Sequence, residues 1–308
     1  MELSLPPYFD PTRVPEVWRV DYEARAADAA EWAERHGIRP AADDSFRTCL
    51  LAVDCQNTFC TPGFELFVPG APEDSRRLCE LVYRELGALT EIVATLDTHR
   101  AFQIFHAAFL VDRDGHHPPP YTSVSVDDVA AGVWRAADPA LQRDLERYVH
   151  ALAEGGKYEL TVWPYHAMLG GVGHALVSAV EEAFFFHALA RGTQTRFELK
   201  GGDPLTEHYS ALRPEVGGGE ANLALVEHLR SFDAVYVAGQ AKSHCVAWTV
   251  EDLLRLAPEI APRLFLLEDC TSPVVAGELD FTAQADETFA RFASAGAHVT
   301  SSSRGFER

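Results

Sequence analysis

Short apolar runs alternate with helical patterns over most of the chain, and this alternation constrains the fold more than any other feature of the sequence. Continuous apolar runs of this length are typical of parallel strands that are buried on both faces. The runs lie at 48–54, 91–97, 197–200, 233–239, 263–269 and 298–302, and helical patterns lie near 74–88, 174–190, 221–230, from about 245, and at 282–294. We therefore predict an α/β fold in which a parallel β-sheet of about six strands carries helices on both faces.

Two segments depart from this alternation. Residues 1–45 contain Pro-rich turns followed by an Ala- and Glu-rich stretch, Val17 to His36, which we predict to be helical. We interpret residues 1–45 as an N-terminal extension of a main domain that spans 46–308. Residues 107–162 combine the irregular sequence GHHPPPYTSVSVDD with a charged helical pattern near 138–154. We expect this second segment to be an insertion packed beside the sheet, either as a lid or as a subunit contact.

The charge and the cysteines narrow the classes of function. The net charge of −20 argues against a nucleic-acid partner, because phosphate binding needs clustered Lys and Arg. No run approaches the roughly 20 apolar residues of a membrane span, and the N-terminus lacks the basic and apolar regions of a signal peptide. The 6 cysteines do not suggest a disulfide framework. We expect a cytoplasmic protein with reduced thiols that binds neither nucleic acid nor membrane.

Three reactive residue types lie at or just after the ends of predicted strands, where α/β proteins collect their functional groups. Asp54 ends the first strand, Lys200 ends the strand at 197–200, and Cys245 follows the strand at 233–239 at the start of a helix. A helix start supplies backbone N–H groups that lower a thiol pKa and bind an oxyanion. Taken singly, each has a plainer interpretation, as a turn residue, a solvated lysine or a buried thiol. Together they are the parts of a thiol amidohydrolase: a nucleophile, a proton acceptor and a cation that holds both.

A candidate metal site lies in the sequences TLDTHRAFQIFH and WPYH. Asp97 and His99 are two residues apart, so an extended backbone directs both side chains to one side. With His106 and His166 they form a carboxylate and imidazole set that suits Zn²⁺, Fe²⁺ or Mn²⁺ and leaves positions open for water or substrate. The alternative is that these are capping or surface residues of a chain with 13 histidines.

The collinear motifs VDCQNTFC, TLDTH, WPYH, FELKGG and GQAKSHCV cover most of residues 47–300. Through them the chain resembles the isochorismatase-like cysteine hydrolases, and among these the nicotinamidases. The resemblance implies an isochorismatase-like three-layer sandwich with Asp54, Lys200 and Cys245 as the catalytic triad. It also implies a cis peptide bond between Gln240 and Ala241, with the N–H groups of Ala241 and Cys245 forming the oxyanion hole.

The resemblance also implies a cofactor and a substrate pocket. Asp97, His99 and His166 match the ligands of one divalent metal ion, with His106 as a further ligand. Aromatic residues that enclose the ring of the substrate are expected at Phe59 and Trp163. Gln240 and Tyr209 complete the predicted substrate-binding residues. The expected partners are a small-molecule amide and further copies of the chain in a homo-oligomer.

The expected activity is hydrolysis of nicotinamide to nicotinate and ammonia through a Cys245 thioester, which would serve NAD salvage. The extension at 1–45 and the insertion at 107–162 depart from the compact nicotinamidases, so the motifs support the mechanism better than the substrate. The first alternative is a hydrolase of another small amide, such as a ureido or carbamoyl compound, on the same triad. The second is a non-catalytic binding protein of the same fold. An isochorismatase is disfavoured, because those enzymes lack the catalytic cysteine.

Overall fold

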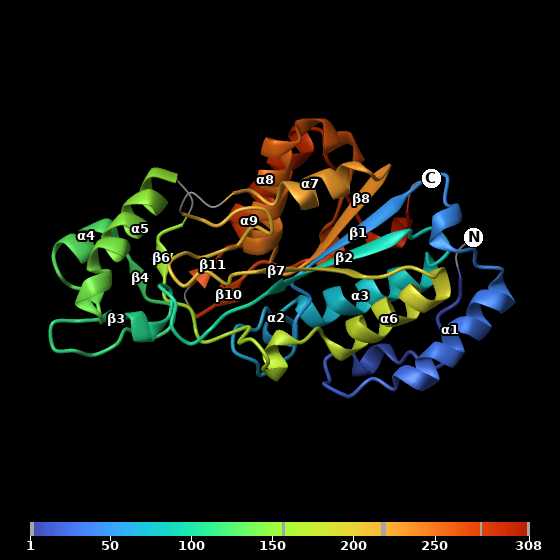
Figure 1. The fold of residues 1–308 in the computed structure, drawn as a ribbon, viewed down its shortest axis with the longest axis horizontal. Helices are drawn as coiled ribbons and strands as arrows, with labels where there is room; N and C mark the ends of the chain where they lie inside the picture. Colours follow the sequence, from blue (N-terminus) through green and yellow to red (C-terminus); the bar gives the residue numbers. More distant parts are fainter. Residues whose placement is uncertain (1–2, 156–157, 217–219, 278, 307–308) are drawn as a thin grey trace.

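The six predicted strands form a single parallel sheet in the computed structural model of the chain (Figure 1). The structure describes residues 3–155, 158–216, 220–277 and 279–306. The strands are β1 (Thr48–Val53), β2 (Glu91–Asp97), β7 (Arg196–Lys200), β8 (Ala234–Gly239), β9 (Leu264–Leu267) and β12 (His298–Thr300). Their order is β12-β9-β8-β1-β2-β7, and each neighbouring pair is parallel. The predicted α/β class and parallel sheet are therefore confirmed.

Helices cover both faces of the sheet. Figure 1 shows α3 (Ala71–Arg84) and α6 (Ser178–Arg191) on one face, with α7 (Leu223–Arg230), α8 (Ala247–Leu256) and α9 (Thr282–Ser294) on the other. This covering explains the continuous apolar sequences of the central strands, because every residue of β1 and β8 is buried. β7 lies at the edge of the sheet, and its residues alternate between partly buried and exposed positions before Lys200.

The strand order places a reversal of direction between β1 and β8. From β1 the chain continues outward to β2 and β7, and from β8 it continues to β9 and β12 in the opposite direction. The connections after the two central strands therefore separate and leave a crevice at their carboxyl ends. A ligand site is expected at this point of the sheet.

Several helix boundaries differ from the predictions, and two of them have a clear local cause or consequence. The helix predicted over 17–36 is α1 (Tyr22–His36), and it begins later because the side chain of Asp21 caps it by accepting from Ala24 N. The helix predicted to start at Cys245 is α8, which begins at Ala247. Cys245 itself lies in a preceding π-helical turn, Lys242–Val246.

The N-terminal residues add an outer layer to the face that carries α6. Helix α1 packs against α6, and Trp18 exchanges two hydrogen bonds with the Ser178 hydroxyl. The buried Arg191 of α6 binds the Asp44 carboxylate and the Arg39 carbonyl. Several buried polar contacts thus join residues 1–45 to the rest of the molecule.

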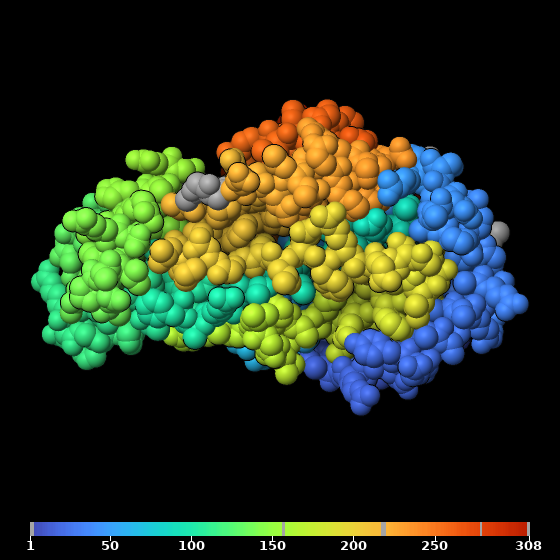
Figure 2. Space-filling model, in the orientation of Figure 1, coloured from blue at the N-terminus to red at the C-terminus, as the bar shows by residue number. Residues whose placement is uncertain are grey.

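The segment predicted as an insertion forms a lobe beyond the carboxyl edge of the sheet, where we had expected it beside the sheet. Figure 2 shows this lobe as one end of an elongated molecule. It contains the helices α4 (Val126–Ala130) and α5 (Gln142–Gly155) and the short strands β3 (Leu110–Val111), β4 (Ser123–Val124), β5 (Arg135–Ala136) and β6 (Leu160–Thr161). β3 pairs with β5 and β4 with β6, and α5 buries one apolar face. The lobe is therefore placed to touch the site at the strand ends.

The remaining elements include α2 (Asn57–Cys60), directly after β1, and the strand pair β10 (Val275–Ala276) and β11 (Leu279–Asp280). All six cysteines are free and buried. No helix in the described part of the chain combines the length and the apolar character that a membrane span needs.

Candidate active site

The three residues predicted as a triad meet at the carboxyl edge of the sheet, around the ammonium group of Lys200. Its Nζ lies 2.9 Å from Asp54 Oδ2 and 3.5 Å from Cys245 Sγ. The same Nζ also lies 2.9 Å from Asp97 Oδ1 and donates to the carbonyl of His208 at 2.9 Å. Parallel strands bring residues from distant parts of the sequence to one edge, so Lys200 contacts groups at or just after the ends of β1, β2 and β8.

Asp54 is held in place by its backbone as well as by Lys200. Its φ of 46° lies in the left-handed region, which non-glycine residues adopt mainly where the surroundings fix them. The Thr95 hydroxyl accepts from Asp54 N at 3.0 Å and donates to Asp54 Oδ1 at 2.5 Å. The Asp54 carboxyl is fully buried with a fixed orientation toward Lys200.

The turn that carries Cys245 follows β8 directly. The peptide bond Gln240–Ala241 is cis, as the resemblance implied. Gly239, with φ of 109°, allows the close approach of this turn to β1, since a Cβ there would lie 1.9 Å from the carbonyl oxygen of Val53. The Ala241 carbonyl accepts from Val246 N at 3.2 Å, so the turn folds back on itself and directs Cys245 inward.

Gln240 does not lie where its predicted role in substrate binding requires. Its Nε2 donates to Asp74 Oδ2 at 2.9 Å, and its Oε1 accepts from Ser272 N at 3.3 Å. The side chain is buried between α3 and the segment after β9, away from the cavity that contains Cys245. Gln240 therefore supports the turn rather than the cavity.

Burial is the largest influence on the pKa values of Cys245, Asp54 and Lys200. Burial raises the pKa of the Cys245 thiol well above its usual range, although the Lys200 charge opposes this. The lowering that we expected at a helix start is absent because the thiol is buried in a turn before α8. Burial likewise raises the pKa of the Asp54 carboxyl. Burial acts to lower the pKa of Lys200, but the charges of Asp54 and Asp97 hold it well above its usual range.

Three of the predicted metal ligands form a compact buried group. Asp97 Oδ2 lies 2.7 Å from His99 Nε2 and 3.5 Å from His166 Nε2, and the three candidate ligand atoms all lie within 4.8 Å of one another. The Nδ1 atom of His99 faces the Gly201 carbonyl at 3.3 Å, and that of His166 faces the Pro164 carbonyl at 2.8 Å. These carbonyls accept from Nδ1–H, so each Nε2 atom, once it carries no proton, can direct its lone pair at an ion. The residues therefore fit a divalent transition metal.

His106 lies beside this group without joining it. Its ring centre is 6.1 Å from that of His99 and 6.3 Å from that of His166, and burial lowers its pKa to about 3. Gly201 closes the other side of the group. A Cβ at Gly201 would lie 2.8 Å from His99 Cε1 and 3.0 Å from Asp97 Oδ1, so only glycine allows this approach.

A cavity opens directly over Cys245 and the candidate metal ligands. It encloses about 360 Å³ of space between atoms, part of which is open to solvent. Its lining residues are Phe59, Leu66, Asp97, Trp163, His166, Glu207, Tyr209, Ala241, His244, Cys245 and Val274. Phe59, Trp163 and Tyr209 thus line one cavity together with Cys245, and Trp163 Nε1 donates to Tyr209 Oη at 3.0 Å.

Sequence reasoning missed two polar residues of this cavity. His244 precedes the cysteine and stacks on Tyr158 at 4.6 Å between ring centres, and burial lowers its pKa to about 3. Glu207 is buried in the loop after β7, and burial raises its pKa to about 8. Their types alone gave no signal, although His244 adjoins Cys245 in sequence.

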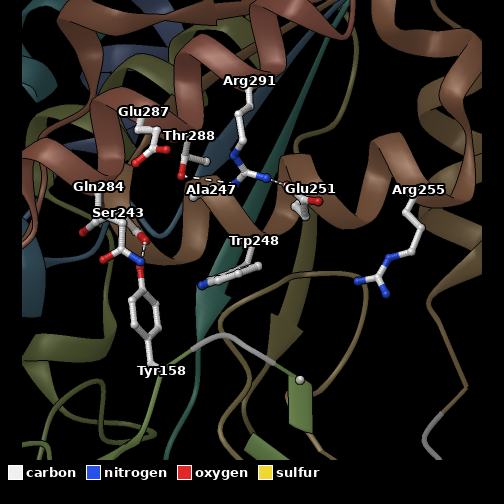
Figure 3. Close-up of a pocket in the computed structure, with 11 residues that line it drawn as sticks. Tyr158, Ser243, Ala247, Trp248, Glu251, Arg255, Gln284, Glu287, Thr288 and Arg291 are labelled. Atoms are coloured by element: carbon white, nitrogen blue, oxygen red, sulfur yellow. Dashed lines mark hydrogen bonds and ion pairs between the residues drawn. The ribbon is translucent and has the colours of Figure 1, made fainter. Parts of the chain in front are cut away.

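The lobe at 107–162 reaches the turn of Cys245 through Tyr158. The Tyr158 hydroxyl donates to the carbonyl of Ser243 at 2.6 Å, as Figure 3 shows at the edge of a second, outer pocket. That outer pocket lies against α8 and α9 and includes Trp248, Glu251 and Arg291. The lobe therefore fixes the outer side of the turn that carries the nucleophile.

Comparisons with known proteins find likeness in structure alone. No protein-family model matches the chain, and no curated protein matches it in sequence. A nicotinamidase and pyrazinamidase from Acinetobacter baumanii is 20% identical with a TM-score of 0.57, over 85% of this chain and 99% of that one. The yeast nicotinamidase bound to the inhibitor nicotinaldehyde is 19% identical with a TM-score of 0.57, over 82% and 99%.

A third similar structure is a protein from L. infantum in complex with nicotinate. It is 20% identical with a TM-score of 0.53, over 86% of this chain and 98% of that one. At these identities the likeness concerns the fold. The chain has the fold of the nicotinamidases, as its sequence motifs implied.

Proposed function

We propose that the chain is a metal-containing cysteine amidohydrolase that converts nicotinamide and water to nicotinate and ammonia. The observation that carries this proposal is the position of Lys200, which contacts Asp54, Asp97 and Cys245, and the last two of these line one cavity with aromatic walls. Folding alone does not require a buried ammonium, two buried carboxylates and a thiol at one point. The shared fold of the nicotinamidases supports the same activity.

In the first half of the reaction, Cys245 attacks the amide carbonyl carbon. Because burial raises the thiol pKa, the thiol needs a base, and Asp54 accepts its proton as the C–S bond forms. The N–H groups of Ala241 and Cys245 bind the oxyanion that develops. Lys200 stays charged throughout and holds the carboxylate and the sulfur in contact.

Breakdown of this intermediate releases ammonia. Asp54 returns its proton to the amine as the C–N bond breaks, which leaves a thioester on Cys245. A water molecule then adds to the thioester, and Asp54 takes one of its protons. The C–S bond breaks, the acid leaves and the thiol regains its proton, so the residues return to their starting states.

Asp97, His99 and His166 would hold the divalent ion, which we propose to be Zn²⁺, Fe²⁺ or Mn²⁺. When bound, such an ion supplies a Lewis acid for a ring nitrogen or for water. The flat rings of Phe59 and Trp163 line the same cavity and suit stacking on a planar heterocycle. These groups favour nicotinamide over an aliphatic amide.

The test is an ammonia-release screen over nicotinamide, pyrazinamide, ureido and carbamoyl compounds and small aliphatic amides, with metal content measured on the same sample. We expect turnover of nicotinamide, its loss in Cys245→Ala, and retention in Cys270→Ala, which removes a buried thiol outside the cavity. Turnover retained by Cys245→Ala would overturn the thioester route. Turnover of only ureido or carbamoyl compounds would show that the triad acts on that substrate class instead of nicotinamide.

A further inference from the structure

We propose that Glu207, which lies outside the motifs of the resemblance, is a fourth protein ligand of the cation held by Asp97, His99 and His166. This inference rests on the metal site of the proposed function. It assigns a role to the loop after β7 and to the lobe at 107–162.

The first argument is the position of the Glu207 carboxylate. Its Oε1 lies 4.0 Å from His99 Nε2, close enough for one ion to contact both atoms. Glu207 lines the same cavity as Asp97 and His166, and it is 4% exposed.

The second argument is that the carboxylate is only partly paired, because Oε1 accepts from His208 N at 3.4 Å while Oε2 has no such bond within the described part of the chain. Glu207 Oε2 is buried and has no hydrogen-bond partner among the residues that the structure describes. The Lys200 ammonium is committed to Asp54 and Asp97. In its ionised form, a buried carboxylate with one unpaired oxygen is unfavourable, and a cation beside His99 would offset this penalty.

The third argument is that the main chain of Glu207 is held on both sides. Its N–H donates to the Tyr148 hydroxyl at 3.0 Å, and its carbonyl accepts from Glu215 N at 2.9 Å and from Thr206 Oγ1 at 2.9 Å. Tyr148 belongs to α5 of the lobe and is buried. The lobe thus anchors the loop that presents the carboxylate to the metal site.

The resulting donor set has a simple chemical consequence. Two neutral imidazoles and two carboxylates carry two negative charges, which balance those of a divalent cation. A second carboxylate also adds a hard oxygen donor to the ligand set, which favours Mn²⁺, Fe²⁺ or Zn²⁺ over ions that prefer soft sulfur ligands. Glu207 would add to the three ligands Asp97, His99 and His166 a contact from the loop after β7.

The test measures metal binding instead of turnover. All variants carry Cys245→Ala, so that the thiol cannot act as a ligand. Apparent affinities for Zn²⁺ and Co²⁺ are measured in competition with a chromophoric chelator, and the visible absorption of the Co²⁺ form reports its coordination. The variants are Glu207→Gln, Glu207→Asp and Tyr148→Phe, with Asp203→Asn as a control that removes an exposed carboxylate from the same loop.

We expect Glu207→Gln and Glu207→Asp each to weaken binding by at least about tenfold, the scale on which even outer-shell partners act. Both should change the Co²⁺ spectrum, and Asp203→Asn should change neither property. Tyr148→Phe keeps the carboxylate but loses its anchor, so we expect a smaller loss of affinity. Glu207→Asp is informative because it preserves the charge while withdrawing the oxygen atoms by one methylene.

Unchanged affinity and spectrum in Glu207→Gln would overturn the inference and leave the proposed function intact. Weakened binding with an unchanged spectrum, or full affinity in Glu207→Asp, would also overturn it, since a remote charge effect explains either result. A parent protein that binds neither ion would overturn both this inference and the metal part of the proposed function. Absence of ammonia release from every amide would contradict the proposed function alone.

Discussion

Replacing Lys200 with methionine tests the centre of the site most directly. The substitution keeps most of the side-chain volume and removes the charge that contacts Asp54, Asp97 and Cys245. It leaves two carboxylates facing each other in the protein interior, where both are buried. We therefore expect loss of turnover together with a large loss of folding stability.

The size of that loss follows from the geometry. With an effective dielectric constant of about 20, two unit charges 2.9 Å apart attract by about 6 kcal/mol. Desolvation of the three ions cancels much of this attraction, so Lys200→Met should destabilise the protein by about 3–5 kcal/mol. Adding Asp54→Asn removes one uncompensated charge and should restore about 1–3 kcal/mol of that loss.

The assay is urea unfolding of the metal-free protein, followed by fluorescence and circular dichroism. The matched control is Lys242→Met, because Lys242 is also buried but pairs with Glu268 and Asp286, whose side chains are 52% and 60% exposed. Exposed partners make that pair worth at most about 1 kcal/mol. Equal losses for the two lysine variants, or no recovery in the double variant, would refute the electrostatic reasoning.

Asp54→Asn should abolish ammonia release yet lower the pKa of Cys245, since a buried negative charge disfavours the thiolate. The rate of Cys245 alkylation by iodoacetamide, measured by mass spectrometry as a function of pH, checks this, and an unshifted pH profile would count against it. Tyr158→Phe removes the bond to the Ser243 carbonyl, so it should cost about 1 kcal/mol in thermal unfolding and lower kcat more than KM. Burial lowers the pKa of His187 to about 4. The unfolded chain then binds this proton more readily below about pH 6.5, so stability should fall by up to about 3 kcal/mol as pH drops toward 4. His187→Gln should flatten that decline in urea titrations, and an unaltered slope would exclude this histidine as its source.

The sheet could be predicted from sequence because its strands satisfy a local rule. Strands buried on both faces must be apolar throughout, and runs such as Glu91–Asp97 show this without knowledge of their neighbours. The turn of Cys245 obeys no such rule. Its π-helical form depends on contacts from remote segments, such as the bond from Lys242 N to the Ser272 carbonyl, so the start of α8 was misplaced.

The side chains that line the cavity could be predicted only where they belong to a sequence motif or lie near one. Phe59, Trp163 and Tyr209 belong to motifs or lie beside them, and they line the cavity. Gln240 also belongs to a motif, but its side chain faces Asp74, whose position depends on the packing of α3. Glu207 could not be found at all, because the hydrogen bond that holds its main chain goes to Tyr148, 59 residues earlier in the chain.

Asp97 connects the two halves of the candidate site. Its Oδ1 contacts the ammonium of Lys200, and its Oδ2 faces His99 and His166 of the candidate metal ligands. The Asp97 carboxylate therefore helps to fix the position of the Lys200 ammonium, which contacts Cys245. The same carboxylate also belongs to the candidate metal ligands, with His99 and His166. Groups that share a partner in a dry interior do not act independently. The candidate metal ligands and the proposed nucleophile form one electrostatic unit, so that a substitution at His166 should also alter the environment of Lys200.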